Sequence, residues 1–418
     1  MNVCMLTNLF RPVVSGSATQ SEALAKQLVK RGNRVVVITA HVERSAPSYE
    51  ETDGVHVYRL PAIKMPKLPI SLNFPWLSWT FTPGNLRRVE AVLRRHRAEI
   101  VHLHNHMFDL AFSAVVMRRR LGIPLVIGMH TIIRHTTAAY NVMLYPADRL
   151  FIRCAVVEQA EMLLCPDTNA VHYAREAFPR TPRVLIPYGV ELPEQPSPGR
   201  VAELRRRHGL EGKRVILSLG HVHDVRNRRD EVRALAEVLK VFPDVVLLIV
   251  GAETTDIPRR LAKELGVGGS VIFAGHAPHS DVPTYLAMAE LEVHLFYQDT
   301  EEKTSLGIAS LEAMAAGRVV ISAANRNTYG PDLLRSGENI VLVERGKPAR
   351  LAQAIIGLLA DEEKRRRMGK AAARFVRSHF GWDDICQRTL EVYGDARRRY
   401  RGAGALWQRR ATESAGAR

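Results

Sequence analysis

The amino-acid sequence predicts an α/β protein with two doubly wound, Rossmann-like domains that face a cleft. Short apolar segments alternate with amphipathic helical segments, a pattern typical of parallel sheets covered by helices on both faces. The alternation stops at the proline-rich segment Pro187–Gly199 and then starts again. Because such a segment can continue neither a helix nor a central strand, it predicts a domain boundary.

The first domain is expected within residues 1–190. Its predicted strands are Val3–Thr7, Val35–Ala40, Ile100–Leu103, Leu125–Met129, Met162–Cys165 and Val184–Ile186, and its predicted helices include Ala18–Lys30, Asn85–Arg97 and Leu110–Leu121. The second domain is expected within residues 200–382. Its predicted strands are Val215–Leu219, Val245–Val250, Val271–Phe273, Leu291–Leu295 and Val319–Ser322, and its predicted helices include Asp230–Val241, Ile257–Leu265 and Leu306–Ala316. A last helix, 383–400, is expected to complete the first domain, and the basic tail 401–418 is expected to be disordered.

The composition is that of an ordinary globular protein, since 46% of the 418 residues are hydrophobic and 24% are charged. No apolar run reaches the roughly 18 residues of a membrane-spanning helix. The N-terminal segment lacks the features of a secretory signal. The four cysteines are widely scattered, which favours a reducing compartment over a disulfide framework. We therefore expect a cytoplasmic protein.

The net charge of +16 has two interpretations. It reflects either arginine-rich usage with a solvated tail, or attraction to anionic lipid, anionic glycan or a phosphorylated substrate. Peripheral contact with the cytoplasmic face of an anionic membrane belongs to the second interpretation. Nucleic acid is disfavoured as a partner, because no basic stretch is interleaved with aromatic residues.

A first candidate site lies where the strand Val3–Thr7 meets the next helix. The turn between them contains Gly16, which would let a ligand approach the backbone, and the helix start would supply free N–H groups for an anion. The turn lacks the GxGxxG spacing of a dinucleotide site. An ordinary strand-to-helix turn is the alternative interpretation.

A second constellation follows the strand Leu291–Leu295. Thr304 or Ser305 is expected to cap a helix with Gly307 in its first turn, and the helix start would attract phosphate. Glu312 lies five residues beyond Gly307, about 7–8 Å along the helix axis. That distance suits a carboxylate that binds the ribose of a nucleotide whose diphosphate lies at the helix start. The alternative is a capped helix with one acid on a solvated face.

Over about residues 1–395 the chain resembles the retaining GT-B glycosyltransferases of family 4, also called group 1. The resemblance rests on the order and spacing of several stretches: residues 8–16 (NLFRPVVSG), 24–35, 100–104 (IVHLH), 122–131 (GIPLVIGMHT), 186–190 (IPYGV) and 311–317 (LEAMAAG). It implies a fold of two Rossmann-like domains. The N-terminal domain would bind the acceptor, and the C-terminal domain would bind a nucleotide-diphosphate sugar.

The resemblance also implies roles for individual residues. Glu312 matches the second glutamate of the family's E-x7-E motif, which binds the donor ribose. Gly16 matches a loop glycine near the donor phosphate, and His130 matches a histidine that lines the reaction centre. Ile308 and Ala309 fall where helix-start amides meet the diphosphate and nucleoside. Without the family resemblance, His130 is more typical of a structural histidine at a strand end.

The sequence departs from the family pattern at four positions. Ser15 occupies the place of the first of two adjacent glycines in the first loop. Thr304 occupies the place of the first glutamate of E-x7-E. His221 occupies the place of an arginine after the first strand of the second domain, and Asn227 that of a lysine. Two neighbouring arginines, Arg226 and Arg228, are candidates to supply the missing charge as catalytic residues. They are alternatively solvated residues at the start of the next helix.

The expected reaction is sugar transfer from a UDP- or GDP-sugar to a hydroxyl of a glycan, lipid-linked or small-molecule acceptor. The resemblance implies front-face substitution, in which the leaving diphosphate helps to deprotonate the acceptor. No cofactor or metal is expected, and the sequence has no DxD triplet. His102, His104 and His106 alternate along a strand edge and so share one face, but no carboxylate follows at ligand spacing, which disfavours a metal site there.

The segment Ile63–Thr82 is a candidate acceptor loop. It contains Trp76 and Trp79 together with several prolines, and it either receives a lipid-linked acceptor at a membrane interface or packs on the core. Two rival functions remain at this level. One is a non-catalytic protein that binds a nucleotide sugar or a partner on a degenerate fold, and the other is a phosphorylase or epimerase on the same fold.

Overall fold

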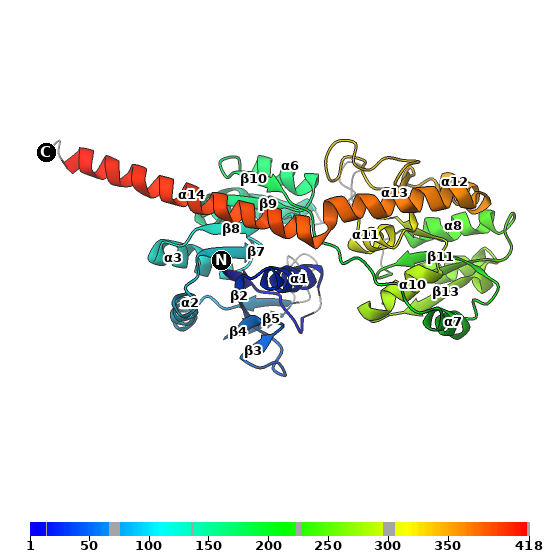
Figure 1. Ribbon diagram of the computed structural model, residues 1–418, viewed down its shortest axis with the longest axis horizontal. Helices are drawn as coiled ribbons and strands as arrows, with labels where there is room; N and C mark the ends of the chain where they lie inside the picture. Colours follow the sequence, from blue (N-terminus) through cyan, green and yellow to red (C-terminus); the bar gives the residue numbers. More distant parts are fainter. Residues whose placement is uncertain (14, 67–75, 135–137, 223–226, 296–305, 416–418) are drawn as a thin grey trace. The chain divides into compact units, whose positions relative to one another are not determined.

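The computed structural model describes residues 1–415 apart from 14, 67–75, 135–137, 223–226 and 296–305, with the backbone alone for Trp76 and 402–415. The chain forms two compact units: unit 1 comprises Met1–Gly189 and Trp382–Arg418, and unit 2 comprises Val190–Gly381. Each unit contains a mainly parallel sheet between helices (Figure 1), which confirms the predicted fold class. None of the described helices combines the length and apolar composition needed to cross a bilayer.

The main sheet of unit 1 has eight strands in the order β10-β9-β8-β7-β1-β2-β4-β3. All neighbours are parallel except β3 and β4. The strands are β1 (Asn2–Thr7), β2 (Arg34–His41), β3 (Tyr49–Thr52), β4 (Val55–Pro61), β7 (Ile100–His104), β8 (Leu125–Gly128), β9 (Met162–Cys165) and β10 (Arg183–Leu185). All six strands expected in this domain are therefore present, and β3 and β4 extend the sheet at one edge.

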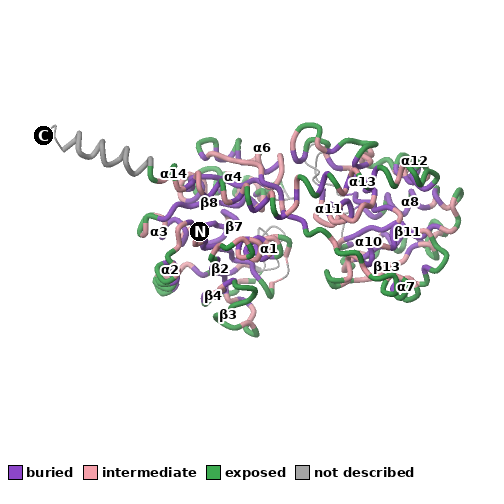
Figure 2. Tube along the Cα trace, viewed as in Figure 1, coloured by how far each residue is buried: buried purple, intermediate pink, exposed green. Residues whose placement is uncertain are grey.

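Alternate side chains of the strands in unit 1 enter two separate cores, because successive residues of a strand point to opposite faces. Val3 and Met5 pack with α1 (Gly16–Lys30) and α14 (Trp382–Ala415). Cys4 and Leu6 pack on the other face with α2 (Pro83–Arg95), α3 (Leu110–Leu121) and α6 (Thr168–Ala177). The strands are accordingly buried along most of their length (Figure 2).

The C-terminal helix α14 supplies part of the core of unit 1. Its residues Ile385, Cys386, Val392 and Tyr393 are buried in the same cluster as Val3. The helix includes residues up to Ala415, within the segment that the sequence marks as a basic tail. Residues 401–415 contain four alanines and three arginines, which are good helix formers.

Unit 2 has a wholly parallel sheet in the order β13-β12-β11-β14-β15-β16. The strands are β11 (Arg214–Leu219), β12 (Val245–Val250), β13 (Val271–Gly275), β14 (Leu291–His294), β15 (Val319–Ser322) and β16 (Val341–Leu342). One face packs on α7 (Pro198–Arg207), α10 (Val282–Met288), α11 (Ile308–Ala315) and α13 (Glu362–Phe380). The other face packs on α8 (Arg228–Val238), α9 (Ile257–Glu264) and α12 (Pro348–Ala360).

The strand order reverses at β1 in unit 1 and at β11 in unit 2. β1 lies between β7 and β2, and β11 lies between β12 and β14. In open parallel sheets, ligands bind outside the carboxyl ends of the strands at such a reversal. Each unit therefore presents one position for a ligand, at the end of its central strand.

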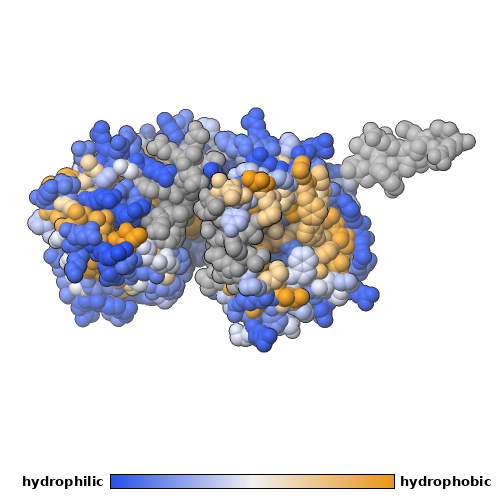
Figure 3. All heavy atoms as spheres, turned by 180° about the vertical axis from the view of Figure 1, so that it is seen from behind, coloured by the Kyte–Doolittle hydropathy of each residue, from blue (hydrophilic) through white to orange (hydrophobic). Residues whose placement is uncertain are grey.

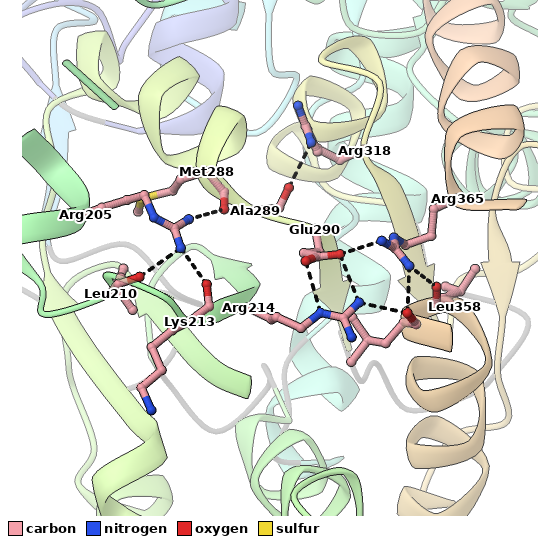
Figure 4. Close-up of polar contacts among 11 residues, drawn as sticks. Arg205, Leu210, Lys213, Arg214, Met288, Ala289, Glu290, Arg318, Leu358 and Arg365 are labelled. Carbon is pink, nitrogen blue, oxygen red and sulfur yellow. Dashed lines mark hydrogen bonds and ion pairs between the residues drawn. The ribbon is translucent and has the colours of Figure 1, made fainter. Parts of the chain in front are cut away.

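A cluster of arginines lies at the amino ends of the strands of the unit 2 sheet, opposite the carboxyl ends where a ligand is expected (Figure 4). Glu290 accepts hydrogen bonds from Arg214 at 3.1 Å and pairs with Arg365 at 2.7 Å. Burial acts to raise the pKa of Glu290, but the two arginines outweigh it and lower the pKa. The carboxylate therefore stays ionised and ties β11 and β14 to α13, at the edge of the sheet away from the candidate site.

Candidate functional site

In unit 1 the first candidate position is the start of α1, directly after β1. Ser15 is the N-cap and its hydroxyl accepts a hydrogen bond from the Ala18 amide. Gly16 is the first helical residue, and a Cβ built on it meets no atom within 4 Å. The first turn of a helix has N–H groups without intrahelical partners. An anion could therefore approach the backbone at Gly16 without steric obstruction.

His130 follows β8 and belongs to a row of aromatic rings. Its Nε2 is 2.9 Å from His104 Nδ1, and its Nδ1 is 2.9 Å from the Tyr188 hydroxyl. The His130 ring is nearly parallel to both partners, with interplanar angles of 9° and 6°. His102 stacks on His104 and forms a 2.7 Å hydrogen bond with the hydroxyl of Tyr393 in α14. Both nitrogens of His130 are thus held by other rings of unit 1.

Burial keeps these imidazoles neutral. It lowers the pKa of His130 to about 4 and that of His102 to about 3, and it also lowers the pKa of His104. An imidazole with such a pKa carries no charge near neutral pH. The ring row can therefore orient or hydrogen-bond a ligand, but it supplies no positive charge to one.

A pocket of about 50 Å³ adjoins this row of rings, and its other walls include α1, α14 and the segment 186–189. Gly189 lines the pocket and packs closely on α14, since a Cβ on this residue would lie 2.5 Å from the Trp382 indole. The glycine of the IPYGV stretch is therefore required by the close approach of α14. This packing places Tyr188 against His130.

The third histidine of the alternating set, His106, lies beyond the end of β7 in a different environment. It is fully buried, with its Nε2 3.3 Å from Asp148 and 3.4 Å from the Tyr173 hydroxyl. The three histidines therefore do not form one set of ligands. Within the described part of the chain, no group of three or more His, Cys, Asp and Glu side chains could hold a metal ion.

In unit 2 the candidate position is the start of α11. Gly307 is the N-cap of this helix and has no side chain that could cap it. Thr304 and Ser305, the expected cap residues, lie outside the described residues. A Cβ on Gly307 would lie 2.9 Å from the His294 ring at the end of β14, so local packing favours glycine there. Ile308 and Ala309 form the first turn. The positive end of the helix dipole lies at these residues.

Glu312 lies one turn further along α11 and is largely buried, with 13% of its side chain exposed. Its Oε1 is 2.8 Å from Nε2 of His279, which lies in the short helix His279–Asp281 and is 68% exposed. Among the described residues, the partner of this carboxylate is therefore the exposed side chain of His279. A ligand hydroxyl could replace or share this contact.

Arg228 begins α8 but is not solvated, since only 1% of the residue is exposed. Its Nη1 is 2.9 Å from Glu231 and also contacts Ser218, and its Nη2 donates to the Leu219 and Gly220 carbonyls at 3.1 and 3.2 Å. The interpretation of Arg228 as a solvated residue is therefore wrong. Its charge is balanced by Glu231 and it holds the end of β11.

Asn227, in the position of the family lysine, is the N-cap of α8 and bonds the Asp230 amide and carboxylate. His221 follows β11 and is exposed. Arg226 and Thr304 lie outside the described residues. Sequence reasoning missed His279, His294 and Tyr188; only His294 has a sequence signal, because it ends a strand that precedes the candidate helix.

The candidate acceptor segment is described at its two ends. β5 (Ile63–Pro66) pairs with β6 (Trp76–Trp79), and Ile63 lies opposite Trp79. Buried Asp109 fixes the chain beyond β6, because its carboxylate accepts hydrogen bonds from the Thr80 hydroxyl at 2.8 Å and the Phe81 amide at 2.7 Å. Trp79 is nevertheless 40% exposed. The segment is thus anchored to the core while one of its tryptophans faces solvent.

Comparison with known proteins gives matches along almost the whole chain. Residues 201–375 match the family "Glycosyl transferases group 1", and residues 15–189 match the "Glycosyl transferase 4-like domain". D-inositol 3-phosphate glycosyltransferase of Acidothermus cellulolyticus is 30% identical over 394 residues, covering 89% of this chain and 84% of that protein. Alpha-monoglucosyldiacylglycerol synthase of Streptococcus pneumoniae is 23% identical over 78% of this chain and 71% of that protein.

Two solved structures show the same fold. A glycosyltransferase from Rickettsia africae has a TM-score of 0.71 at 13% identity, covering 94% of this chain and 98% of that chain. Anabaena HepE in complex with UDP and glucose has a TM-score of 0.68 at 18% identity, covering 94% and 99%. At these identities the structural likeness concerns the fold alone.

The neutral state of the histidine row can be tested by titration. We expect the ring resonances of His102 and His130 to stay constant in NMR spectra between about pH 8 and pH 6, because burial lowers both pKa values. In the unfolded chain the same residues gain a proton near pH 6.5. Acidification from about pH 6.5 to pH 4 should therefore favour the unfolded state, and the urea midpoint should fall. Titration of these rings near pH 6.5 in the folded protein would contradict this account.

Proposed function

Because the chain belongs to the group 1 glycosyltransferases and has their GT-B fold, it is a glycosyltransferase, and we propose the following reaction for it. The enzyme takes a sugar from a nucleotide-diphosphate donor, a UDP- or GDP-sugar. It transfers the sugar to a hydroxyl of a glycan, lipid-linked or small-molecule acceptor, with retention of configuration and without a divalent metal. Unit 2 binds the donor and unit 1 binds the acceptor.

The observation that carries this proposal is the start of α11. The helix begins at Ile308 after a glycine N-cap, which has no side chain of its own. Free helix-start amides and the positive end of the helix dipole are a common binding site for phosphate. His294 fills the space beside Gly307 and so favours a residue without a side chain there. We therefore assign the donor diphosphate to the amides at Ile308 and Ala309.

Glu312 completes this donor site. It lies on the same helix, about 7–8 Å along the axis from Gly307, a separation that fits a diphosphate followed by a ribose. A carboxylate accepts two hydrogen bonds from vicinal hydroxyls without rearrangement. Its bond to the exposed His279 keeps the carboxylate oriented before the donor binds. Glu312 is therefore proposed to bind the ribose hydroxyls.

The charge on the leaving diphosphate must be met as the sugar bond breaks. The contacts of Arg228 with Glu231 and the carbonyls of β11 favour a positioning role over direct phosphate contact. It would fix the end of β11, which His221 directly follows. We propose that His221 and Arg226, together with the α11 amides, meet the charge of the leaving diphosphate. In unit 1, the open helix start at Gly16 offers further amides to a phosphate.

The reaction then follows from positioning. In front-face substitution the acceptor hydroxyl attacks the sugar carbon on the side from which the diphosphate leaves. An oxygen of the departing diphosphate accepts the hydroxyl proton, so no protein nucleophile is required. The protein holds both substrates in contact and stabilises the leaving group. Neutral His130, fixed by His104 and Tyr188, is proposed to orient a sugar or acceptor hydroxyl.

Replacement of the ribose-binding carboxylate should weaken donor binding. Glu312→Ala is expected to cost about 1.5–3 kcal/mol in affinity for the donor, the range for a hydrogen bond to a charged group. Isothermal titration calorimetry measures the change. The matched control is Glu264→Ala, which removes an exposed carboxylate at the end of α9 in the same unit and should leave affinity unchanged. Equal donor affinity in the folded Glu312 variant and the control would remove Glu312 from the site.

The proposed reaction is tested by an assay of labelled sugar nucleotides with the full chain. We expect slow hydrolysis of one UDP- or GDP-sugar without acceptor, and the rate should survive EDTA because amides and cationic side chains meet the diphosphate charge. Loss of activity with EDTA and recovery with Mg²⁺ or Mn²⁺ would contradict metal independence. Absence of both binding and turnover for every UDP- and GDP-sugar would contradict the donor class.

A further inference from the structure

An exposed helical segment of unit 1 has an unusual distribution of apolar residues. It consists of α4 (Ala138–Pro146), a π-helical turn, η1 (Ala147–Ile152), and α5 (Arg153–Ala155). No residue of α4 is buried. Its Val142 is 77% exposed and its Met143 59% exposed, while Leu150 and Phe151 in the π-helical turn are 66% and 61% exposed. An ordinary surface helix turns such residues toward the core.

The exposed residues of this segment recur at intervals of four. A continuous α-helix has 3.6 residues per turn, so a period of four would drift around its axis. A π-helical turn is wider, with i→i+5 hydrogen bonds, and it compensates for this drift. The result is one outward line of exposed residues, which we call the apolar stripe: Val142, Met143, Pro146, Ala147, Leu150 and Phe151.

The opposite side of the segment is fastened by a buried acid. Asp148 is 1% exposed, accepts a 2.6 Å hydrogen bond from the Tyr173 hydroxyl, and lies 3.3 Å from His106. Asp148 is the only acidic residue between Ala138 and Ala155. The segment therefore presents no negative charge beside the stripe, and the Asp148 contacts fix which side faces outward.

The apolar stripe continues into the acceptor segment through ring contacts. The distance between ring centroids is 6.0 Å from Phe151 to Phe112 of α3 and 5.7 Å from Phe112 to Phe81. It is 6.4 Å from Phe81 to the exposed Trp79. Ile63, which is 63% exposed, lies opposite Trp79. We call the stripe together with these aromatic residues and Ile63 the apolar face. The space-filling view shows apolar side chains gathered on unit 1, the half that carries the C-terminal helix (Figure 3).

Basic residues accompany this face. Arg149, within the segment, is 46% exposed and its guanidinium lies over the Tyr145 ring at 5.1 Å. The helices next to the aromatic residues carry exposed arginines at 87, 88, 119 and 120. Their nearby acids are few: Glu90 pairs with Arg94 and Arg120, and Glu176 lies 3.8 Å from Arg149. The whole chain has a net charge of +16.

We propose that the apolar face rests in the interface of an anionic lipid bilayer. Exposed aliphatic and aromatic side chains gain free energy when they enter the acyl boundary, and neighbouring arginines attract anionic headgroups. Tryptophan is favoured at the same depth. A second copy of the chain fits this face less well, because it would bring a further sixteen positive charges against the first. The proposal is independent of the donor and acceptor assigned above.

Co-sedimentation with vesicles tests the proposal. The full chain is mixed with vesicles of phosphatidylcholine alone or with added phosphatidylglycerol, and no sugar nucleotide is present. Wild type should bind the anionic vesicles, and binding should weaken with salt. Val142→Asp with Leu150→Asp should lower the partition coefficient by about tenfold or more, because both side chains leave the apolar stripe.

The matched control is Val241→Asp with Leu265→Asp. These residues of unit 2 are 54% and 43% exposed and lie outside the apolar face, so the control makes the same change of charge. It should bind vesicles within about twofold of wild type if the face is responsible. Should the first double variant unfold, Val142→Ser with Leu150→Ser retains the loss of apolar contact without added charge.

Three outcomes would overturn the proposal. The first is equal vesicle binding by the stripe variant and the control, and the second is equal wild-type binding to neutral and anionic vesicles. The third is a wild-type dimer in analytical ultracentrifugation that becomes monomeric in the stripe variant, since the face would then join two copies. Donor binding measured on the same samples is a separate readout, so a failure here does not depend on the fate of the proposed reaction.

Discussion

The structure depends on one constraint, that both faces of each parallel sheet must be covered. In unit 1 the sequence up to Gly189 supplies helices that cover one face fully and the other only in part. The missing cover comes from α14, which is separated from the rest of unit 1 by the whole of unit 2. Burial of Tyr393 in this helix places its hydroxyl on His102, and Trp382 packs on Gly189. The row of neutral rings that includes His130 is therefore a consequence of how the sheet is closed.

The start of α11 shows how a missing side chain can create a binding position. His294 occupies the space that a side chain at 307 would need, so the helix has a glycine N-cap, which carries no side-chain oxygen. The first-turn amides at Ile308 and Ala309 are those that we propose to bind an external anion. Arg228 differs from this helix start, because its side chain is used inside the unit. The sequence made it a candidate to contact the diphosphate, but its charge is balanced by buried Glu231.

Much of the fold could be predicted because parallel strands read as continuous apolar runs. Val3–Thr7 and Val245–Val250 are examples of this simple local signal. The close packing of His294 on Gly307 could not be predicted, because it arises only in the folded unit. The contacts of His130 with Tyr188, and of Phe151 with Phe112, join residues far apart in sequence. No local pattern predicts such contacts.

A crystal structure of the chain with UDP or GDP bound tests the central claim most directly. The account predicts a diphosphate oxygen within about 3 Å of the amide nitrogens of Ile308 and Ala309. It also predicts that the ribose hydroxyls bind the Glu312 carboxylate. A diphosphate held elsewhere in unit 2, with Glu312 still bonded to His279 and no ribose beside it, would contradict the account.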